Sequence, residues 1–406
     1  MAALKILLAA LVISSLKDCL IFTAVFSKLI CDMRAIHKII LSLIFFSLAG
    51  FASQTAPSEK YIVYYGTSDA SAAVAVTNDL FIVADDENNI LRVYKTGQPG
   101  LPLFTYDLTE FLEIESEYPE ADIEGATILG DYIYWLTSHG RNQDGKIRPN
   151  RYRFFATKAD VRDGNVTITP AGVPCKTLVH HLLKAENMRQ LGLDKATCFD
   201  DAALTKQQRK KLAPKQEGLN IEALCASSDS NTIYIGFRNP RPGSKALVVP
   251  LTNPRQVIEK QAPPVFAPPL LWDLNGLGIR SMEYSSFHKA YFIIAGPHND
   301  EPRTRRFGLV QGKPPFALYR WSGENEMPPA FVRKLNMDKY NFSPEALVVF
   351  KDSQHLLLLS DDGTLPIDVP DTSQCLPDRL LDDGDCPNKF LADPNKKSFR
   401  AAWLTP

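Results

Sequence analysis

The sequence lacks an excess of charge of either sign. Its 406 residues include 45 Lys and Arg against 46 Asp and Glu, which gives a formal net charge of −1 at pH 7. A protein that binds nucleic acid needs a basic face, and these totals do not indicate one. We therefore expect a small molecule or a metal ion as the partner and no nucleic acid, while the oligomeric state is left open.

The familiar catalytic motifs are also missing. The chain has no Gly-x-Ser-x-Gly elbow, no His-Glu-x-x-His helix, no phosphate-binding glycine loop and no Rossmann fingerprint. Any catalysis would therefore depend on carboxylates, arginines, a histidine and a bound metal. The sequence leaves open whether the protein is an enzyme, and if it is one we expect a hydrolase.

No uninterrupted apolar run is long enough to cross a bilayer comfortably. Residues 1–32 are apolar but are broken by Lys17 and Asp18. We interpret this stretch as an upstream over-extension of the reading frame, with synthesis starting at Met33. The alternative is an N-terminal membrane anchor, and only in that case would a membrane be a partner.

Residues 33–52 have the pattern of a secretory signal peptide. A short basic start is followed by an apolar core at residues 39–48 and by small residues at 50–52. This pattern predicts a secreted or periplasmic protein whose mature part is residues 53–406.

Cysteine is scarce in the mature part. Export permits disulfides, and pairing by nearness predicts two bridges, Cys175–Cys198 and Cys375–Cys386. Cys225 lies in an apolar run and is expected to be a buried free thiol. Because five cysteines can pair in several ways, other connectivities stay open.

What the chain does have is an internal repeat. A glutamate recurs in short segments that are each followed by a turn and a strongly apolar run. The four glutamates are Glu124, Glu222, Glu283 and Glu345. Successive copies lie roughly sixty residues apart once a helical-looking segment, residues 176–212, is removed from the first interval.

A repeat of this length with four β-type runs is typical of a propeller blade. An earlier unit at residues 72–84 fits without a glutamate and makes five blades, while a sixth in the Pro-rich stretch 262–271 stays open. The β-type run at 60–65 stands alone, so we expect it to complete the last blade beside residues 398–404. The sequence thus predicts an all-β, five-bladed β-propeller with a short helical insertion.

Hairpin geometry predicts where the polar residues of the repeat meet. The start of the first strand and the end of the second strand lie on one face because the two strands are antiparallel. Polar residues end the second run of each unit, so we expect them to converge with the glutamates around one mouth of the channel. They include Asp85, Asp86, Glu87, His139, Arg141, Arg238, Asn239, His298, Asp361 and Asp362.

Carboxylates that converge in a partly buried place need a cation, an arginine or shared protons. Oxygen ligands suit a hard ion such as Ca²⁺ or Mg²⁺. One interpretation is therefore a metal site, and the other is that arginines neutralise the glutamates in salt bridges between blades; both can hold at different blades. The predicted metal ligands are Glu124, Glu222, Glu283, Glu345 and Asp361.

The same mouth supplies candidates for catalysis and for binding an anionic ligand. A histidine can act as an acid or a base near neutral pH, and a guanidinium group suits an anion. The catalytic candidates are His139, Glu222 and Glu283. The ligand-binding candidates are Arg141, Arg238, Arg280 and Asn239. Binding of a metal or a small anion is the preferred function, with a metal-dependent phosphoester or lactone hydrolase, or a glycoside hydrolase with a carboxylate pair, as alternatives.

Several motifs resemble a bacterial secreted family of unknown function, the one numbered 3616. They include Asp-Ile-Glu-Gly-Ala at 122–126, Ser-His-Gly-Arg-Asn at 138–142, Glu-Gly-Leu-Asn-Ile-Glu-Ala-Leu at 217–224 and Gly-Phe-Arg-Asn-Pro at 236–240. The resemblance spans about residues 60–404 and implies no particular activity. More distantly, the Glu-Gly pattern is similar to phytase-like propellers, which hydrolyse phosphoesters with calcium held by acidic residues, although the full acidic and lysine set of those proteins has no clear equivalent here.

Overall fold

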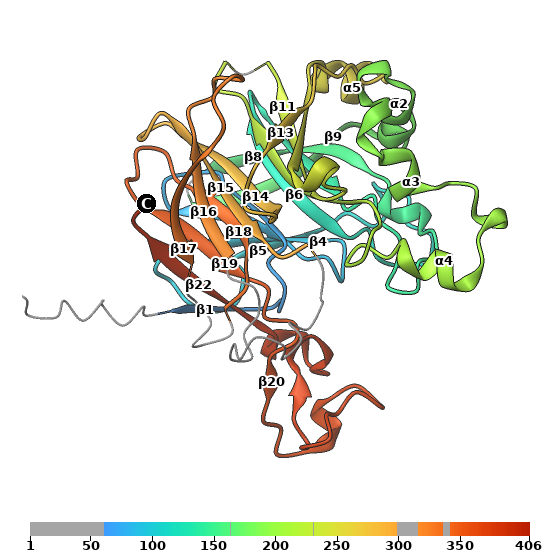
Figure 1. Ribbon diagram of the computed structural model, residues 1–406. Coiled ribbons are helices and arrows are strands. Elements are labelled where there is room, and N and C mark those ends of the chain that lie inside the picture. The colour runs from blue at the N-terminus through green and yellow to red at the C-terminus, as the bar shows by residue number, and fades with distance from the viewer. Residues whose placement is uncertain (1–60, 163, 230, 299–315, 336–341) are drawn as a thin grey trace, which may run out of the picture. The chain divides into compact units, whose positions relative to one another are not determined.

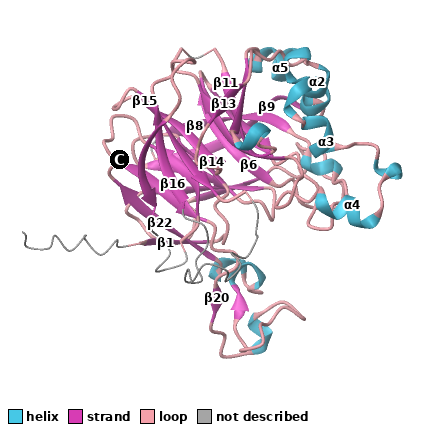
Figure 2. Ribbon diagram, in the orientation of Figure 1, coloured by secondary structure: helices cyan, strands magenta, loops and turns pink. Residues whose placement is uncertain are grey.

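The computed structural model describes residues 61–162, 164–229, 231–298, 316–335 and 342–406. These residues form five four-stranded antiparallel sheets and one two-stranded sheet (Figures 1 and 2). The first strands of the five sheets contact one another in the cyclic order β2, β6, β10, β14, β18 and back to β2. The predicted five-bladed β-propeller is therefore confirmed.

The strand bounds follow the blade order. The first blade contains β2 (Ala72–Ala75), β3 (Leu80–Ala84), β4 (Ile90–Lys95) and β5 (Phe104–Asp107). The second contains β6 (Ile123–Leu129), β7 (Tyr132–Thr137), β8 (Phe154–Arg162) and β9 (Asn165–Cys175). The third contains β10 (Asn220–Ala226), β11 (Ile233–Asn239), β12 (Ala246–Leu251) and β13 (Leu270–Trp272). The fourth contains β14 (Gly278–Ser285), β15 (Ala290–Gly296), β16 (Phe316–Trp321) and β17 (Ala330–Leu335). The fifth contains β18 (Pro344–Val349), β19 (Leu356–Ser360), β22 (Ser398–Leu404) and β1 (Ile62–Tyr65).

The ring is closed by the first and last strands of the described chain. β1 pairs with β22, with Ile62 opposite Ala401, as the sequence predicted. Tyr64 of β1 is fully buried, and its ring stacks on Phe399 with the centroids 5.3 Å apart. The Pro-rich stretch 262–271 supplies only the start of β13, the outer strand of the third blade, and not a sixth blade.

The second strands of the blades explain the strongly apolar runs of the repeat. Every residue of β3, β7, β15 and β19 is buried. Such a strand is covered on both faces, because each blade packs between its two neighbours, and it therefore reads as a continuous apolar run rather than an alternating one. One core cluster, for example, joins Ile82 of the first blade to Trp135 of the second.

The segment predicted to be helical, residues 176–212, contains α2 (Leu178–Lys184), α3 (Leu193–Thr197) and α4 (Lys206–Lys211). Leu178 and Leu182 of α2 are buried in the same core cluster as Ile221 of the third blade, so the insertion packs against the propeller. A further helix, α5 (Pro254–Lys260), lies beside β9 (Figure 1). Short 3₁₀ helices span Pro149–Arg151, Glu186–Leu191, Asp201–Ala203, Pro242–Ser244, Thr372–Gln374, Asn388–Phe390 and Pro394–Lys396.

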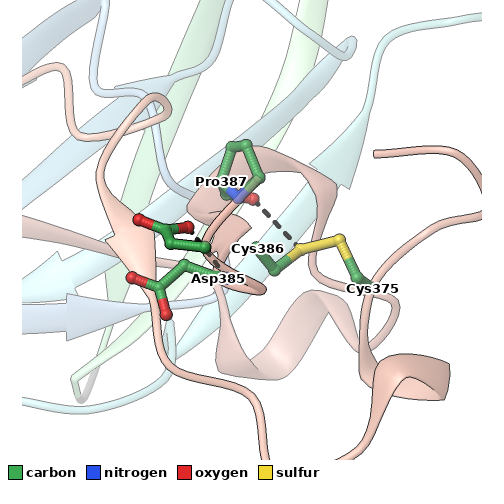
Figure 3. The surroundings of a disulfide bond; sticks show 5 residues. Cys375, Asp385, Cys386 and Pro387 are labelled. Carbon is green, nitrogen blue, oxygen red and sulfur yellow. Dashed lines mark hydrogen bonds between the residues drawn. A yellow bond between two sulfur atoms is a disulfide. The ribbon is translucent and has the colours of Figure 1, made fainter. Parts of the chain in front are cut away.

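Between β19 and β22 the chain forms a C-terminal lobe, residues 363–397, which contains the short sheet of β20 (Pro366–Ile367) and β21 (Cys386–Pro387). The predicted disulfide Cys375–Cys386 is present there (Figure 3). Cys225 is a buried free thiol, as predicted.

The predicted bridge Cys175–Cys198 is wrong, because both of these cysteines are free. Cys175 ends β9, and its sulfur lies 3.8 Å from the Thr177 hydroxyl. Cys198 follows α3, and its sulfur lies 3.9 Å from the carbonyl oxygen of Asp200. Two α-helices and a 3₁₀ helix separate them in the chain, so nearness in sequence did not bring the sulfurs together.

Residues 1–60, which include the expected signal peptide and the stretch upstream of it, lie outside the described residues. Within the part of the chain that the structure describes, no helix is both long and apolar enough to cross a membrane.

The buried Tyr64 gives a test of ring closure. We expect Tyr64→Ala to lower the free energy of unfolding by about 3–5 kcal/mol, because it removes a large buried ring from the strand that closes the propeller. Tyr65→Ala, on the same strand but 40% exposed, is the matched control and should change stability by less than about 1 kcal/mol. Urea unfolding measures both, and equal effects would contradict a special role for Tyr64.

Candidate metal centre

The first strands of four blades share an irregularity near their start. Pairing with the second strand shifts by one residue, and the residue at the shift is Glu124 in β6, Glu222 in β10, Arg280 in β14 and Glu345 in β18. A bulge of this kind re-aims a side chain. The bulge, rather than glutamate itself, is therefore the structural unit that repeats.

This register corrects the sequence alignment in the fourth blade. Glu283 lies three residues beyond the bulge position of β14 and pairs with Phe292 in the regular part of the strand. Burial raises the pKa of Glu283 well above its usual value, and within the described residues its Oε1 atom has no hydrogen-bond partner. The charge of Glu283 acts on the neighbouring thiol of Cys225.

In the first blade the corresponding position is Ser71, directly before β2. Its following residue, Ala72, pairs with Ala84, as the residue after each bulge pairs with the second strand in the other blades. The Ser71 hydroxyl donates to the carbonyl oxygen of Ile123, 2.6 Å away. The first blade thus places a short, neutral side chain where its neighbours place long, charged ones.

The bulge residues of the third, fourth and fifth blades are joined by salt bridges. Arg280 Nη1 lies 2.9 Å from Glu222 Oε2, and Arg280 Nη2 contacts Glu345 Oε1. Arg238, at the end of β11, reaches Glu222 Oε1 at 3.0 Å. Burial disfavours the charge of Arg280, but Glu222 and Glu345 hold its pKa above the usual value. In these three blades, arginines therefore neutralise the glutamates through salt bridges between blades. Binding of an anionic ligand by Arg238 or Arg280 stays a prediction.

Two groups of three carboxylates flank the first blade. The Asp69 triad consists of Asp69, Glu345 and Asp361, and the Asp86 triad consists of Asp86, Asp122 and Glu124. In each triad, one oxygen from every residue lies within 4.8 Å of the others. The Asp69 triad joins the fifth blade to the first, and the Asp86 triad joins the first to the second.

Each triad contains a buried carboxylate oxygen that no hydrogen bond satisfies. Among the described residues, Asp69 Oδ1 and Asp86 Oδ1 have no partner, and the side chain of Asp69 is almost wholly buried at 5% exposure. Buried polar atoms are nearly always hydrogen-bonded in proteins. These two atoms therefore need a partner that the side chains around them do not supply.

One member of each triad is already paired with an arginine. Glu345 contacts Arg280, as described above, and Asp122 Oδ2 lies 2.7 Å from Arg151 Nη1. Asp122 also accepts a hydrogen bond from the Ser138 hydroxyl. These contacts fix one ligand of each triad in place, whereas no salt bridge within the described residues pairs the other two carboxylates.

The electrostatics of the triads follow from this crowding. Burial, reinforced by neighbouring carboxylates such as Asp361, raises the pKa of Asp69 well above its usual value. Burial and the adjacent acidic groups do the same to Asp86 and Glu124. Burial raises the pKa of Asp122 less, because Arg151 opposes it. Burial and crowding thus disfavour the charged form of these carboxylates, and their oxygens are the hard ligands that Ca²⁺ and Mg²⁺ prefer.

The structure divides the five predicted metal ligands. Glu345 and Asp361 meet in one triad, Glu124 belongs to the other, Glu222 lies in the salt-bridge network, and Glu283 is in neither. The sequence reasoning missed Asp69 and Asp122 as ligands and did not single out Asp86. An alignment on the bulge would have found the first two, because each stands two residues before a bulge position.

His139 lies behind the mouth. It is buried, with a φ of 53°, and its Nδ1 donates to the carbonyl oxygen of Thr137 at 2.8 Å. Its Nε2 is buried and has no partner in the described part of the chain. Burial lowers the pKa of His139 to about 4, so the ring is uncharged at neutral pH, and a catalytic role for it stays a prediction.

Arg141 and Asn239 hold loops together. The Arg141 guanidinium donates to the carbonyl oxygen of Gly145 at 2.7 Å and pairs with Asp201 of the insertion at 2.6 Å. Asn239 Nδ2 donates to the carbonyl oxygens of Pro214 and His298. These contacts connect the protein's own loops to one another, and a ligand-binding role for either residue stays a prediction.

Comparisons with solved structures give remote similarities. A chain of a nidogen/laminin complex matches with 9% identity and a TM-score of 0.34, covering 75% of this chain and 87% of that one. The hydrazine synthase of Kuenenia stuttgartiensis matches with 8% identity and a TM-score of 0.31, covering 79% of this chain and 63% of that one. Similarities this weak do not bear on function. A search of curated proteins by sequence found no match.

The family comparison is more specific. The family described as "Protein of unknown function (DUF3616)" matches residues 69–358, from Asp69 at the mouth to β19 of the fifth blade. The matched region includes the four bulges and the two aspartates, Asp69 and Asp122, that precede β2 and β6. The chain therefore belongs to the DUF3616 family of proteins of unknown function.

Proposed function

We propose that this protein is a metal-binding β-propeller that holds a divalent cation, Ca²⁺ in the first instance, in the Asp69 triad at the mouth of its channel. The observation that carries the proposal is the buried, unsatisfied Oδ1 of Asp69 close to carboxylate oxygens of Glu345 and Asp361. A buried carboxylate without a partner is strongly unfavourable, and a cation is the partner that three converging carboxylates suit.

The ligands are supported by the surrounding chain. The three carboxylates come from separate segments: before β2, at the bulge of β18 and directly after β19. Arg280 orients Glu345, and the backbone N–H of Gly363 donates to Asp361 Oδ1 at 3.0 Å. An added Cβ at Gly363 would lie 3.1 Å from Asp69 Oδ2, so glycine keeps this side of the triad open.

The triad suits calcium. Its ligand oxygens all lie within 4.8 Å of one another, and two oxygens on opposite sides of a Ca²⁺ can be that far apart because each lies about 2.4 Å from the ion. Ca²⁺ also takes about six to eight oxygens, so three carboxylates leave positions for water or a bound molecule. The signal-peptide pattern supports a secreted or periplasmic protein, and extracellular calcium sites are typically weak, with Kd of about 10⁻⁴–10⁻³ M.

Calcium should stabilise the protein through Asp69. After chelation and desalting, we expect 10 mM CaCl₂ to raise the free energy of unfolding by about 1–3 kcal/mol for a site of this affinity, seen as a higher Tm. Asp69→Asn keeps the size of the side chain but removes a charged ligand, and it should make this increase clearly smaller by removing the contribution of the Asp69 triad. Glu326→Gln, an exposed position, is the matched control and should behave like the wild type. An equal calcium shift in Asp69→Asn and the wild type would refute the site.

The metal-free protein should lose stability as the pH rises. The native pKa of Asp69 lies above its unfolded value, so the native state binds more protons and stability falls with increasing pH. This contribution is fully present below the unfolded pKa of about 4 and is lost as the pH rises through the native pKa.

The comparison that isolates this effect is the wild type minus Asp69→Asn. In urea unfolding with a chelator between pH 5 and pH 8, the wild type should lose stability relative to the variant as the pH increases. The difference cancels other titrating groups, including His139. Saturating calcium should flatten the trend, and a difference that grows in the opposite direction would show that Asp69 is not protonated in the native state.

A further inference from the structure

The two triads share two of their three positions in the repeat, one blade apart, and differ in the blade that supplies the glutamate. In each blade, the residue after the bulge position pairs with a residue of the second strand, which is Leu359 in the fifth blade and Ala84 in the first. Asp361 and Asp86 each stand two residues after that second-strand residue. Asp69 and Asp122 each stand two residues before a bulge position. The pair of aspartates at one blade junction therefore recurs at the next, where Glu124 of the following blade, rather than a glutamate of the preceding one, completes the triad.

The other three junctions lack this pair of carboxylates. At the positions equivalent to Asp361 and Asp69, they carry Ser138 and Asn220, Arg238 and Gly278, and Gly296 and Ser343. Only the two junctions that flank the first blade place an aspartate at both positions. The acidic character of the mouth is thus concentrated in two matching places rather than spread around the ring.

The charges of the two triads also match. In each, one carboxylate contacts an arginine, Glu345 with Arg280 and Asp122 with Arg151, although Arg151 also contacts the exposed Glu120. Each triad is left with two carboxylates that no such pair neutralises, Asp69 and Asp361 in one and Asp86 and Glu124 in the other. One divalent cation in each triad would neutralise both pairs.

Two nearby cations are paired with other carboxylates. Lys389 of the C-terminal lobe lies 2.6 Å from Glu87, although its charge also acts on Asp86 and Asp69, and Arg238 is paired with Glu222. The first blade contributes only the neutral Ser71 at its bulge-equivalent position, and that hydroxyl is bonded to the backbone of the neighbouring blade. The buried, unsatisfied Oδ1 of Asp86 accordingly faces the same need for a cation as that of Asp69.

We propose that the channel mouth binds two divalent cations of the calcium type, the second in the Asp86 triad, so that the first blade is held between two ions. This inference rests on the proposed function, which requires only the ion in the Asp69 triad. It adds a second site, a stoichiometry and a role for Asp86, Asp122 and Glu124 as ligands.

Flow dialysis with radioactive calcium on the full, chelator-treated chain tests the stoichiometry. We expect two ions per chain in the wild type and in the control Glu326→Gln, and one ion in Asp69→Asn and in Glu124→Gln. The double variant Asp69→Asn/Glu124→Gln should bind none. Asp86→Asn, which should also bind one ion, guards against a folding defect peculiar to Glu124→Gln, and circular dichroism shows that each variant is folded.

The two proposals fail differently in this experiment. Suppose that the wild type binds one ion, which is lost in Asp69→Asn but kept in both Glu124→Gln and Asp86→Asn. That result would overturn the second site and leave the proposed function standing. One ion lost in the latter two variants but kept in Asp69→Asn would overturn the proposed function. No bound calcium in the folded wild type would overturn both.

Discussion

The contact of Arg280 with Glu222 and Glu345 is the interaction on which the centre of the propeller depends. It joins the first strands of the third, fourth and fifth blades through buried charges. Four bulge positions and the equivalent Ser71 occupy the same place in the five first strands, and glutamates at all five would repel one another in a largely buried place. An arginine at one position and a serine at another make the ring compatible with burial. Removal of one partner from such a buried network leaves an uncompensated charge, which typically costs about 3–5 kcal/mol.

The fold was largely predictable because its evidence is local and repeated. Strands covered on both faces, such as β7 and β15, leave continuous apolar runs in the sequence, and the lone β-type run near residue 62 had to pair with the incomplete last blade. The disulfide Cys375–Cys386 closes a short loop, so nearness sufficed to predict it. The same rule failed for Cys175 and Cys198, where intervening helices decide the distance between the sulfurs.

The site was less predictable because it depends on register. A bulge adds one residue to a strand and leaves no mark in composition, so Glu283 looked like a member of the repeat although Arg280 holds that position. The ligands Asp69 and Asp122 lie in the turn that enters the strand, outside the apolar pattern. Which carboxylates meet an arginine and which meet each other is a three-dimensional property that one sequence does not display.

The distribution of arginines around the ring divides it into two halves with different chemistry. On the side of the third and fourth blades, Arg238 and Arg280 neutralise Glu222, so the repeat glutamate there has a counter-charge. On both sides of the first blade, Asp69 and Asp86 keep oxygens without a partner among the described residues. A fold stabilised only by salt bridges would have no reason to concentrate unsatisfied carboxylates at two equivalent junctions, because each destabilises the native state when it ionises. The asymmetry is physically reasonable if the arginine half maintains the ring and the acidic half binds cations from the solution.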